Sequence, residues 1–376
     1  MTFEFSAAHP VLVAVGTRPE AIKLAPVIAA LARRGAPTFL LSTGQHHEML
    51  AQALAALGLE PDRDLAVMRP DQSLAALSAS LLTAADALLA EVEPSWVVVQ
   101  GDTTTVAMVA LAAFYRGLRV AHVEAGLRTG DRRDPFPEEM NRTLLGHLAD
   151  LHLAPTPKAR EHLLAQGVDP AAVHVVGNTV IDALFAMRER VRDRSLADFG
   201  LGFDLPPGRR LVLVTLHRRE SFGAGLRAVC RGLRRLAEEM AGEVEIVYPV
   251  HLNPNVREAA GEVLAGVPGV RLVEPLDYAA FVTLLTSATL VVTDSGGVQE
   301  EAAALGIPLL VTRRTSERPE ALDAGVAELV GTDPDRLATT ARRLLTDPAL
   351  YAERAVPTDA FGDGRAGERI AELLLG

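Results

Sequence analysis

The amino-acid sequence predicts an α/β protein built of two doubly wound parallel-sheet domains. A chain of 376 residues is longer than one ordinary hydrophobic core requires. A composition of 49 % hydrophobic and 23 % charged residues is typical of a globular protein. Short β-branched runs also alternate with longer Ala- and Leu-rich stretches from end to end, which is the pattern of parallel strands covered by helices on both faces.

Two series of strands are expected along the chain. In the first half, apolar runs occupy residues 11–15, 38–41, 96–100, 119–123 and 151–154, and helical spacing occupies residues 19–34 and 74–92. The same rhythm resumes at residues 211–215, 245–250, 270–274, 290–293 and 308–312.

The segment between the two series, residues 188–210, is charged and then rich in Gly and Pro, which indicates an interdomain connection. We therefore expect domains at residues 1–185 and 186–355. Residues 356–376 should contain a last helix that packs back on the amino-terminal domain.

Charge and cysteine content limit the possible partners. A net charge of −11 argues against a nucleic-acid surface, which needs a clustered basic face. The single cysteine, Cys230, lies in the helical-looking run LRAVCRGLRRL, so a buried thiol is expected and no internal disulfide is possible. No secretory signal is apparent, and the uncharged apolar stretches are shorter than the ~18 residues of a membrane helix. We expect a cytoplasmic protein that binds no membrane.

The first expected strand is followed by Gly16-Thr-Arg-Pro-Glu-Ala-Ile-Lys23. In open parallel sheets, ligands bind beyond the carboxyl ends of the strands, where the amino termini of helices favour anions. Arg18 and Lys23 would add positive charge to such a site. The alternative is an ordinary strand–turn–helix with solvated charges. Pro26 should kink or restart the helix.

Carboxylates follow two further expected strands. Asp102 comes after residues 96–100 and could bind a ligand or simply cap the next helix. Glu124 follows residues 119–123, and Glu138 stands in the first turn of a helix introduced by Pro137. The charged loop between the two glutamates either adopts one defined conformation or is a solvated surface loop whose glutamates interact with the helix dipole.

Histidines follow two expected strands of the second half. His217 precedes two arginines, so a phosphate ligand and a structural role are both possible. His251 occupies the equivalent edge, where it could bind a ligand or cap a loop.

The run Asp294-Ser-Gly-Gly-Val-Gln-Glu-Glu301 ends a strand and starts a helix. Ser295 and the free N–H groups beside Gly296 and Gly297 would hold a diphosphate. A glutamate one turn later could bind a ribose diol. Because Glu300 and Glu301 point about 100° apart on a helix, we expect one to face the ligand and the other to face solvent. Arg318 supplies a further cation.

One apparent motif is misleading. Residues 362–367 match the dinucleotide pattern G-x-G-x-x-G, but no expected strand precedes them, so we interpret them as the start of a helix. The sequence contains no Walker A motif, zinc-protease histidine pair or paired-cysteine metal site, and we expect no metal.

Taken in order, GTRPEAIK, QGDTTT, HVEAGLRTGDRRDPFPEEMNR, LVTLHRRESFG, DSGGVQEEAAALG and ERPEAL resemble the non-hydrolysing UDP-N-acetylglucosamine 2-epimerases. The resemblance extends over nearly the whole chain, to GDGRAGERI. It implies two Rossmann-like domains of the glycosyltransferase-B type, usually in a homodimer, that interconvert UDP-GlcNAc and UDP-ManNAc without a cofactor. The implied route expels UDP, forms 2-acetamidoglucal and adds UDP back.

The resemblance also implies roles for individual residues. The catalytic carboxylates would be Asp102, Glu124 and Glu138. Each of them could be the base that removes the proton or the acid that returns it. The groups that stabilise the leaving diphosphate would be Arg18, Lys23 and His217. The nucleotide would be bound by Ser295, Gly296, Gly297, Glu301, Arg318 and His251.

Two further expectations concern support and regulation. Asn141 and Arg142 should support Glu138 from the next helical turn. Bacterial members of the family bind a second UDP-GlcNAc as an allosteric activator, and the matching residues are Gln45, His46, Arg69 and Gln72.

Three other classes of protein share parts of this pattern. A glycosyltransferase of the same fold would not need three carboxylates in the first domain. A hydrolysing epimerase that releases ManNAc and UDP often carries a fused sugar kinase, for which this chain has no room. A nucleotide-sugar-binding regulator would leave the charged EAGLRTGD loop without a task.

Overall fold

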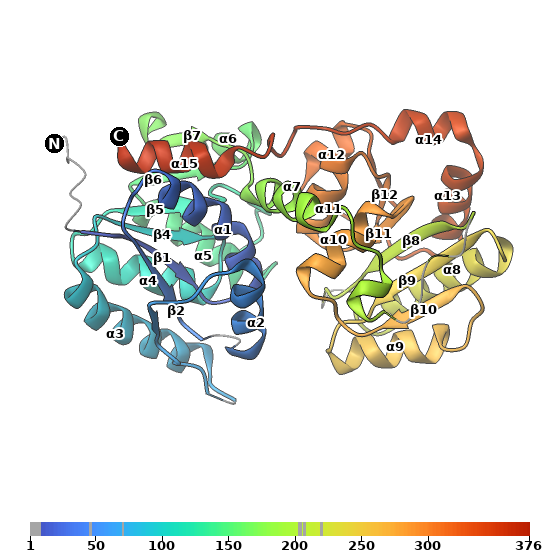
Figure 1. The fold of residues 1–376 in the computed structure, drawn as a ribbon, viewed down its shortest axis with the longest axis horizontal. Helices are drawn as coiled ribbons and strands as arrows, with labels where there is room; N and C mark the ends of the chain where they lie inside the picture. The colour runs from blue at the N-terminus through green and yellow to red at the C-terminus, as the bar shows by residue number, and fades with distance from the viewer. Residues whose placement is uncertain (1–8, 45–46, 70, 202–204, 206–207, 219–220) are drawn as a thin grey trace. The chain divides into compact units, whose positions relative to one another are not determined.

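The computed structural model of the protein describes residues 9–44, 47–69, 71–201, 205, 208–218 and 221–376. The chain divides into two compact units (Figure 1): unit 1 comprises Met1–Ala183 and Gly362–Gly376, and unit 2 comprises Leu184–Phe361. The division falls inside helix α7 (Thr179–Val191), so the charged segment at residues 188–210 belongs to unit 2. Each unit contains a parallel sheet, which confirms the predicted fold class.

The sheet of unit 1 has seven strands in the order β3-β2-β1-β4-β5-β6-β7, all parallel. The strands are β1 (Val11–Val15), β2 (Thr38–Ser42), β3 (Arg63–Asp64), β4 (Trp96–Gln100), β5 (Val120–Val123), β6 (Leu151–Ala154) and β7 (Val173–Val175). The sequence did not predict β3 and β7. Both are edge strands of two and three residues, too short to produce an apolar run.

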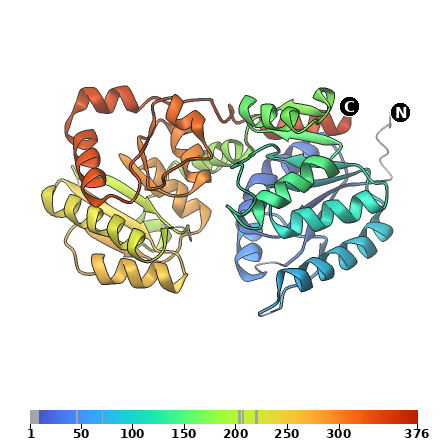
Figure 2. The same ribbon diagram turned by 180° about the vertical axis from the view of Figure 1, so that it is seen from behind.

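Helices cover both faces of this sheet. They are α1 (Arg18–Arg33), α2 (His47–Leu57), α3 (Leu74–Val92), α4 (Thr104–Tyr115), α5 (Glu138–Leu148), α6 (Pro157–Ala165) and α15 (Ala366–Leu375), with a 3₁₀ turn at Pro170–Ala172. Alternate residues of β1 divide the core: Val11, Val13 and Val15 pack with α1, α2 and α15, whereas Leu12 and Ala14 pack with α3, α4 and α5. Figure 2 shows α3, α4 and α5 side by side.

The first and last helices of unit 1 pack together. Helix α1 continues through Pro26 to Arg33, so the expected restart of the helix is wrong. Helix α15 lies against α1 (Figure 1). The Asp182 carboxylate accepts hydrogen bonds from the backbone N–H groups at the start of α15, at 3.1 Å from Ala366 and 2.8 Å from Gly367. This confirms that residues 362–367 lead into a helix.

Helix α3 is long and apolar enough to cross a membrane, with 19 residues and a mean hydropathy of 1.5. This helix was not predicted as a membrane candidate from uncharged stretches alone, because α3 includes Asp86 and Glu91. Its buried residues are Leu77, Leu81, Ala85, Leu88 and Leu89. Since Leu88 and Leu89 join the core under α4, α3 has the packing of a covering helix in an α/β layer.

The sheet of unit 2 has six parallel strands in the order β10-β9-β8-β11-β12-β13. The strands are β8 (Arg210–Thr215), β9 (Val244–Pro249), β10 (Val270–Val273), β11 (Leu290–Thr293), β12 (Leu309–Val311) and β13 (Ala327–Leu329). The sequence did not predict the three-residue edge strand β13.

Helices also flank this second sheet. They are α8 (Ala224–Glu239), α9 (Pro254–Leu264), α10 (Tyr278–Thr286), α11 (Gly296–Leu305), α12 (Pro319–Asp323), α13 (Pro334–Thr346) and α14 (Pro348–Arg354), with a 3₁₀ turn at Ala197–Phe199. Cys230 lies on α8 inside the core, as predicted. Burial raises the pKa of its thiol to about 12.

Candidate active site

Glu124 is the centre of a buried polar cluster at the carboxyl edge of the sheet of unit 1. It follows β5 with a φ of 64°, a left-handed conformation that is uncommon for a non-glycine residue and often occurs at functional sites. Its carboxylate accepts hydrogen bonds from Lys23 Nζ at 2.6 and 2.8 Å and from Asn178 Nδ2 at 3.2 Å. Gln100 Nε2 also donates to it.

These donors come from α1, from the end of β4 and from the start of α7. The positive charge of Lys23 is thus held beside a carboxylate that is buried at 7 % exposure. Charge-assisted hydrogen bonds of this kind fix both partners. Gln100 and Asn178 were not predicted as site residues from the sequence. The available signal for Gln100 was its position as a polar residue at the end of the apolar run WVVVQ. The available signal for Asn178 was the Gly-Asn-Thr turn after β7.

Gly126 sets the path of the loop that follows Glu124. Its φ is 90°, and a Cβ atom added there would lie 2.2 Å from the backbone oxygen of Ala159. No other residue fits without moving α6. The loop therefore leaves the sheet in one direction, as expected for a segment with a defined conformation.

Asp102 lies at the end of the neighbouring strand, where Arg142 on α5 holds it. Arg142 Nε donates to Asp102 Oδ2 at 2.7 Å, and Asn141 Nδ2 donates to the Asp102 backbone oxygen at 2.8 Å. The expectation that Asn141 and Arg142 support Glu138 is therefore wrong, because both turn toward Asp102. The residue that caps α4 is Thr103, whose Oγ1 accepts from the Val106 N–H at 3.4 Å.

The base of the charged loop is closed by Glu139. Its side chain accepts hydrogen bonds from the N–H groups of Thr129 and Gly130, both at 3.1 Å, and from Arg142 Nη1 at 3.1 Å. Glu138 is half-buried beside it, whereas the loop tip at residues 129–134 is exposed. The sequence offered two descriptions of this loop, one defined conformation or a solvated surface loop. The hydrogen-bonded base fits the first description, and the exposed tip fits the second.

Glu20 is a further buried carboxylate, and it was not predicted as a site residue from the sequence. Its Oε2 accepts from the N–H groups of Gly16 at 2.6 Å and Thr17 at 3.1 Å, and its Oε1 accepts from Thr103 Oγ1 at 2.8 Å. The Thr-x-x-Glu spacing of a capping box was the available signal. Burial raises the pKa of Glu20 to about 7, although the hydrogen bonds lower it; the negative charge of Asp102 also raises it.

Two buried histidines lie behind this edge. His122 on β5 and His152 on β6 are paired across the sheet, and each is 1 % exposed. His122 Nε2 donates to the Gly101 backbone oxygen at 2.7 Å. Desolvation lowers the pKa of His122 to about 3 and that of His152 to about 4, so both are neutral near pH 7.

The other predicted residues of unit 1 lie on its loops and helix ends. Arg18 is half-buried at the first position of α1. Arg69 is exposed, and its N–H donates to Gln72 Oε1 at 3.2 Å. Gln45 and His46 lie outside the described residues.

In unit 2, Asp294 connects the ends of β8 and β11. It is 1 % exposed and accepts hydrogen bonds from the N–H groups of His217 at 3.0 Å and Arg218 at 2.9 Å. Arg219 lies outside the described residues. Next to Asp294, Ser295 precedes α11, and its side chain makes no capping hydrogen bond. A Cβ at Gly297 would have no atom within 4 Å, so the start of α11 is open to a ligand.

His217 and His251 stack beside this turn, with ring centroids 5.9 Å apart and an interplanar angle of 25°. His217 Nδ1 is 3.4 Å from Asp294 Oδ1. Desolvation lowers the pKa of His217, with Arg218 and His251 adding to this effect and Asp294 opposing it. Because the two rings stack, the two histidines lie at the same edge of the sheet, as predicted from the sequence.

Both glutamates of α11 are buried, so the expectation that one of them faces solvent is wrong. Glu300 is 0 % and Glu301 is 4 % exposed. Arg318 Nε donates to Glu300, and the Tyr278 hydroxyl donates to Glu301 Oε1 at 2.9 Å. Residues of α10 and next to α12 contact this helix and bury both glutamates. The angle between two side chains on one helix does not predict such contacts with other helices.

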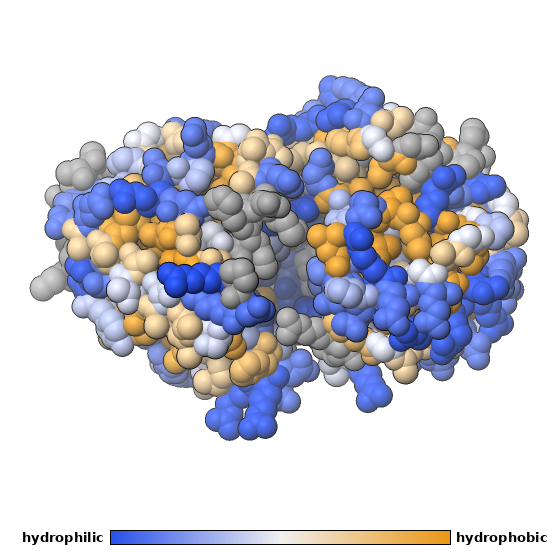
Figure 3. Space-filling model, turned by 90° about the horizontal axis from the view of Figure 1, so that it is seen from below, coloured by the Kyte–Doolittle hydropathy of each residue, from blue (hydrophilic) through white to orange (hydrophobic). Residues whose placement is uncertain are grey.

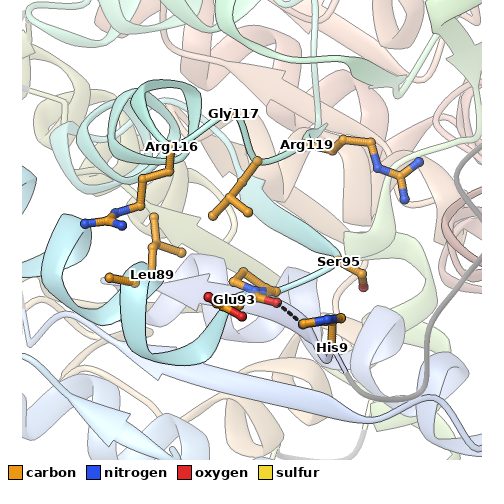
Figure 4. A pocket seen from close by; sticks show the side chains of 10 residues that line it. His9, Leu89, Glu93, Ser95, Arg116, Gly117 and Arg119 are labelled. Carbon is orange, nitrogen blue, oxygen red and sulfur yellow. Dashed lines mark hydrogen bonds between the residues drawn. The ribbon is translucent and has the colours of Figure 1, made fainter. Parts of the chain in front are cut away.

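A described pocket lies elsewhere, away from these residues (Figure 4). Its volume is about 410 Å³, and it is lined by residues that precede β4 and β5, including Ser95 and Arg119. His9 Nδ1 lies 2.7 Å from the Glu93 backbone oxygen there. Because the strands are parallel, this pocket is at the amino edge of the sheet, opposite the carboxylates. Among the described residues, no group of three or more His, Cys, Asp or Glu side chains is arranged to hold a metal.

Comparisons with known proteins agree with the sequence motifs. The family model described as UDP-N-acetylglucosamine 2-epimerase matches residues 29–375. The UDP-N-acetylglucosamine 2-epimerase of Escherichia coli K12 is 47 % identical over 97 % of this chain and 98 % of its own length. The crystal structure of UDP-GlcNAc 2-epimerase from Neisseria meningitidis bound to UDP-GlcNAc matches with a TM-score of 0.92 and 39 % identity, over 97 % of this chain and 99 % of that one.

A glycosyltransferase of kitacinnamycin shares the fold at 17 % identity and a TM-score of 0.63, over 98 % of this chain and 99 % of that one. This likeness supports the glycosyltransferase-B type of architecture. Full-length identity near one half, the family model and the motif order together place the protein: the chain belongs to the UDP-N-acetylglucosamine 2-epimerase family.

Proposed function

We propose that this protein catalyses the reversible epimerisation of UDP-N-acetylglucosamine at C2 to UDP-N-acetylmannosamine without net hydrolysis and without a redox cofactor. The observation that carries the proposal is a pair of cation-held carboxylates at the ends of adjacent strands: buried Glu124 with Lys23 and half-buried Asp102 with Arg142. The relative from Neisseria meningitidis is bound to UDP-GlcNAc.

The chemistry explains why carboxylates and anion-binding groups are both needed. The proton at C2 of the sugar is not beside a carbonyl, so its direct removal is very difficult. In the proposed route, a base takes the C2 proton while the bond from C1 to the diphosphate oxygen breaks, which leaves 2-acetamidoglucal and UDP. UDP then attacks C1 again, and an acid protonates C2 from the opposite face. No electrons are gained or lost overall.

Unit 1 supplies the acid and base groups in this proposal. Asp102 and Glu124 are fixed by their partners, and half-buried Glu138 begins α5 next to the loop base. Fixed carboxylates on rigid strand ends suit proton transfer at a defined carbon. Arg18 stands at the start of α1, where a phosphate would also meet free N–H groups.

Unit 2 supplies the nucleotide site. The open start of α11 at Ser295, Gly296 and Gly297 would bind the diphosphate, and His217 would add a donor as negative charge develops on the leaving group. Glu301 would bind the ribose, held in place by Tyr278. Arg318 is paired with Glu300 behind Gly296 and would support the turn.

The test uses heavy water and UDP-GlcNAc, with no added nicotinamide. We expect UDP-ManNAc with deuterium at C2. Free ManNAc as the main product would identify a hydrolysing enzyme, transfer to an added acceptor would identify a transferase, and binding without turnover would identify a regulator. The Glu124→Gln variant should lose on the order of a hundredfold in rate. Glu161→Gln, an exposed glutamate paired with Lys158 on α6, is the matched control and should retain wild-type activity.

We also propose that the protein is a homodimer through α3, α4 and α5. Only 28 % of the apolar α3 window is buried, and Leu74, Phe114, Tyr115 and Leu144 on these helices are 44 to 66 % exposed. Figure 3 shows apolar residues exposed among hydrophilic ones on unit 1. A second copy would cover this face. Sedimentation should show two chains, and Phe114→Glu should give one; a monomeric wild-type protein would refute the proposal.

We also propose that a second UDP-GlcNAc binds as an activator at the segment that includes Arg69 and Gln72. The rate should depend sigmoidally on UDP-GlcNAc. Arg69→Ala should lower the cooperativity while the protein stays folded, since Arg69 is exposed. A hyperbolic wild-type curve would contradict the site, though not epimerisation.

A further inference from the structure

Glu20 joins two turns of the candidate site, and its partner in the second turn, Thr103, is 83 residues away in sequence. One oxygen accepts the N–H groups of Gly16 and Thr17, in the turn that carries Arg18. The other accepts the hydroxyl of Thr103, in the turn that carries Asp102. This residue is buried, at 2 % exposure, and the described hydrogen bonds of its carboxylate are all with the two turns.

The Gly16 turn packs closely against the first turn of α4, which directly follows the Asp102 turn, and against the residue that follows β2. A Cβ atom added at Gly16 would lie 2.7 Å from Thr105 Oγ1 and 2.8 Å from Thr43 Oγ1. The position of the Asp102 turn relative to α1 is therefore set by close packing and by the Glu20 link together.

The charged groups around Glu20 are otherwise engaged. Asp102 acts on it from the α4 side and is itself paired with Arg142. Lys23, on the same helix as Glu20, is paired with Glu124. Glu20 thus lies near Asp102 and on the same helix as Lys23, and its described hydrogen-bond partners include no cation.

We propose that Glu20 is a positioning residue for Asp102: its ionised carboxylate ties the Asp102 turn to the Arg18 turn and presents a negative charge to Asp102. The inference rests on the proposed epimerisation. When Glu20 takes up a proton, the oxygen that faces Thr103 becomes the donor, because the other oxygen faces two N–H groups. The bond with Thr103 must then reverse, and the charge beside Asp102 is lost.

The expected signature is a pH dependence that a merely structural residue would not produce. Wild-type kcat should rise with pH as Glu20 ionises, around the raised pKa of about 7. The Glu20→Gln side chain is neutral and has nearly the same shape as the protonated carboxyl group of Glu20. The variant should therefore match wild type near pH 5.5, lack the rise, and fall on the order of tenfold below wild type at pH 8, with KM within about twofold.

Asp182→Asn is the matched control. Asp182 is also a helix-capping carboxylate of unit 1 whose pKa is raised, first by burial, but its hydrogen bonds go to the start of α15. This variant should lose stability and keep the wild-type pH profile. If Glu20→Gln retains the wild-type rise, or if wild type shows no rise, the inference is overturned.

A second pair of variants covers the case in which Glu20→Gln does not fold. Thr103→Val removes the hydroxyl that donates to Glu20, and Thr103→Ser restores it. We expect Thr103→Val to lose the rise and Thr103→Ser to recover it; equal profiles would overturn the inference. Wild-type turnover at pH 8 is measured first. If it is absent, the proposed function fails as well, whereas turnover with unchanged variant profiles refutes only the role of Glu20.

Discussion

Lowering the pH from 7 to 5 should destabilise unit 1 through its buried histidines. His122 and His152 have folded pKa values of about 3 and about 4, against 6.5 in the unfolded chain. As the pH falls below 6.5, the unfolded chain takes up protons that the folded chain cannot, so stability is lost. At pH 5 this amounts to about 2 kcal/mol for each histidine relative to pH 7.

Glu20 acts in the opposite direction. Its folded pKa of about 7 exceeds the unfolded value of 4.5, so its contribution is fully present below pH 4.5 and is lost as the pH rises through 7. Between pH 7 and pH 5 it restores about 2 kcal/mol. Together, these three groups should cost the wild-type protein about 2 kcal/mol at pH 5. His122→Asn, which keeps a donor for Gly101, should show almost no loss, whereas Glu20→Gln should lose about 4 kcal/mol.

The assay is urea unfolding followed by tryptophan fluorescence. The protein has one tryptophan, Trp96, which is 6 % exposed in unit 1, and its Nε1 donates to the Leu374 backbone oxygen at 3.0 Å. The signal therefore reports unit 1 and the docking of α15. If His122→Asn loses as much stability between pH 7 and pH 5 as wild type, the reasoning is refuted.

Three further substitutions test the geometry of unit 1. Glu138→Gln should lower turnover on the order of a hundredfold without unfolding the chain; a wild-type rate would make Glu138 an ordinary first-turn residue of α5. Arg142→Lys should lower kcat more than it raises KM, because an ammonium cannot hold Asp102 and Glu139 in the same planar geometry; steady-state kinetics with unchanged kcat would contradict this. Gly126→Ala should prevent the native loop path, lowering both Tm and activity, and an unchanged Tm would show that α6 can move.

Local signals in the sequence were sufficient for the fold class and for most of the site. Apolar runs located ten of the strands, and Gly-containing turns after them located Asp102, Glu124 and Ser295. The edge strands β3, β7 and β13 were not predictable in this way, because strands of two or three residues depend on pairing with a neighbour rather than on their own residues.

The residue types at the strand ends were predictable from the sequence, because a strand, a turn and a helix start each depend on neighbouring residues. The pairs of side chains that meet depend on how the chain folds in three dimensions. Lys23 binds Glu124 across 101 residues, and Arg142 binds Asp102 across 40. These partners follow from the strand order, in which β1 lies beside β4 and β4 beside β5. The burial of side chains also depends on the tertiary fold. Glu20 and Glu301 are enclosed by elements distant in sequence, so the local periodicity of the sequence does not predict that they are buried.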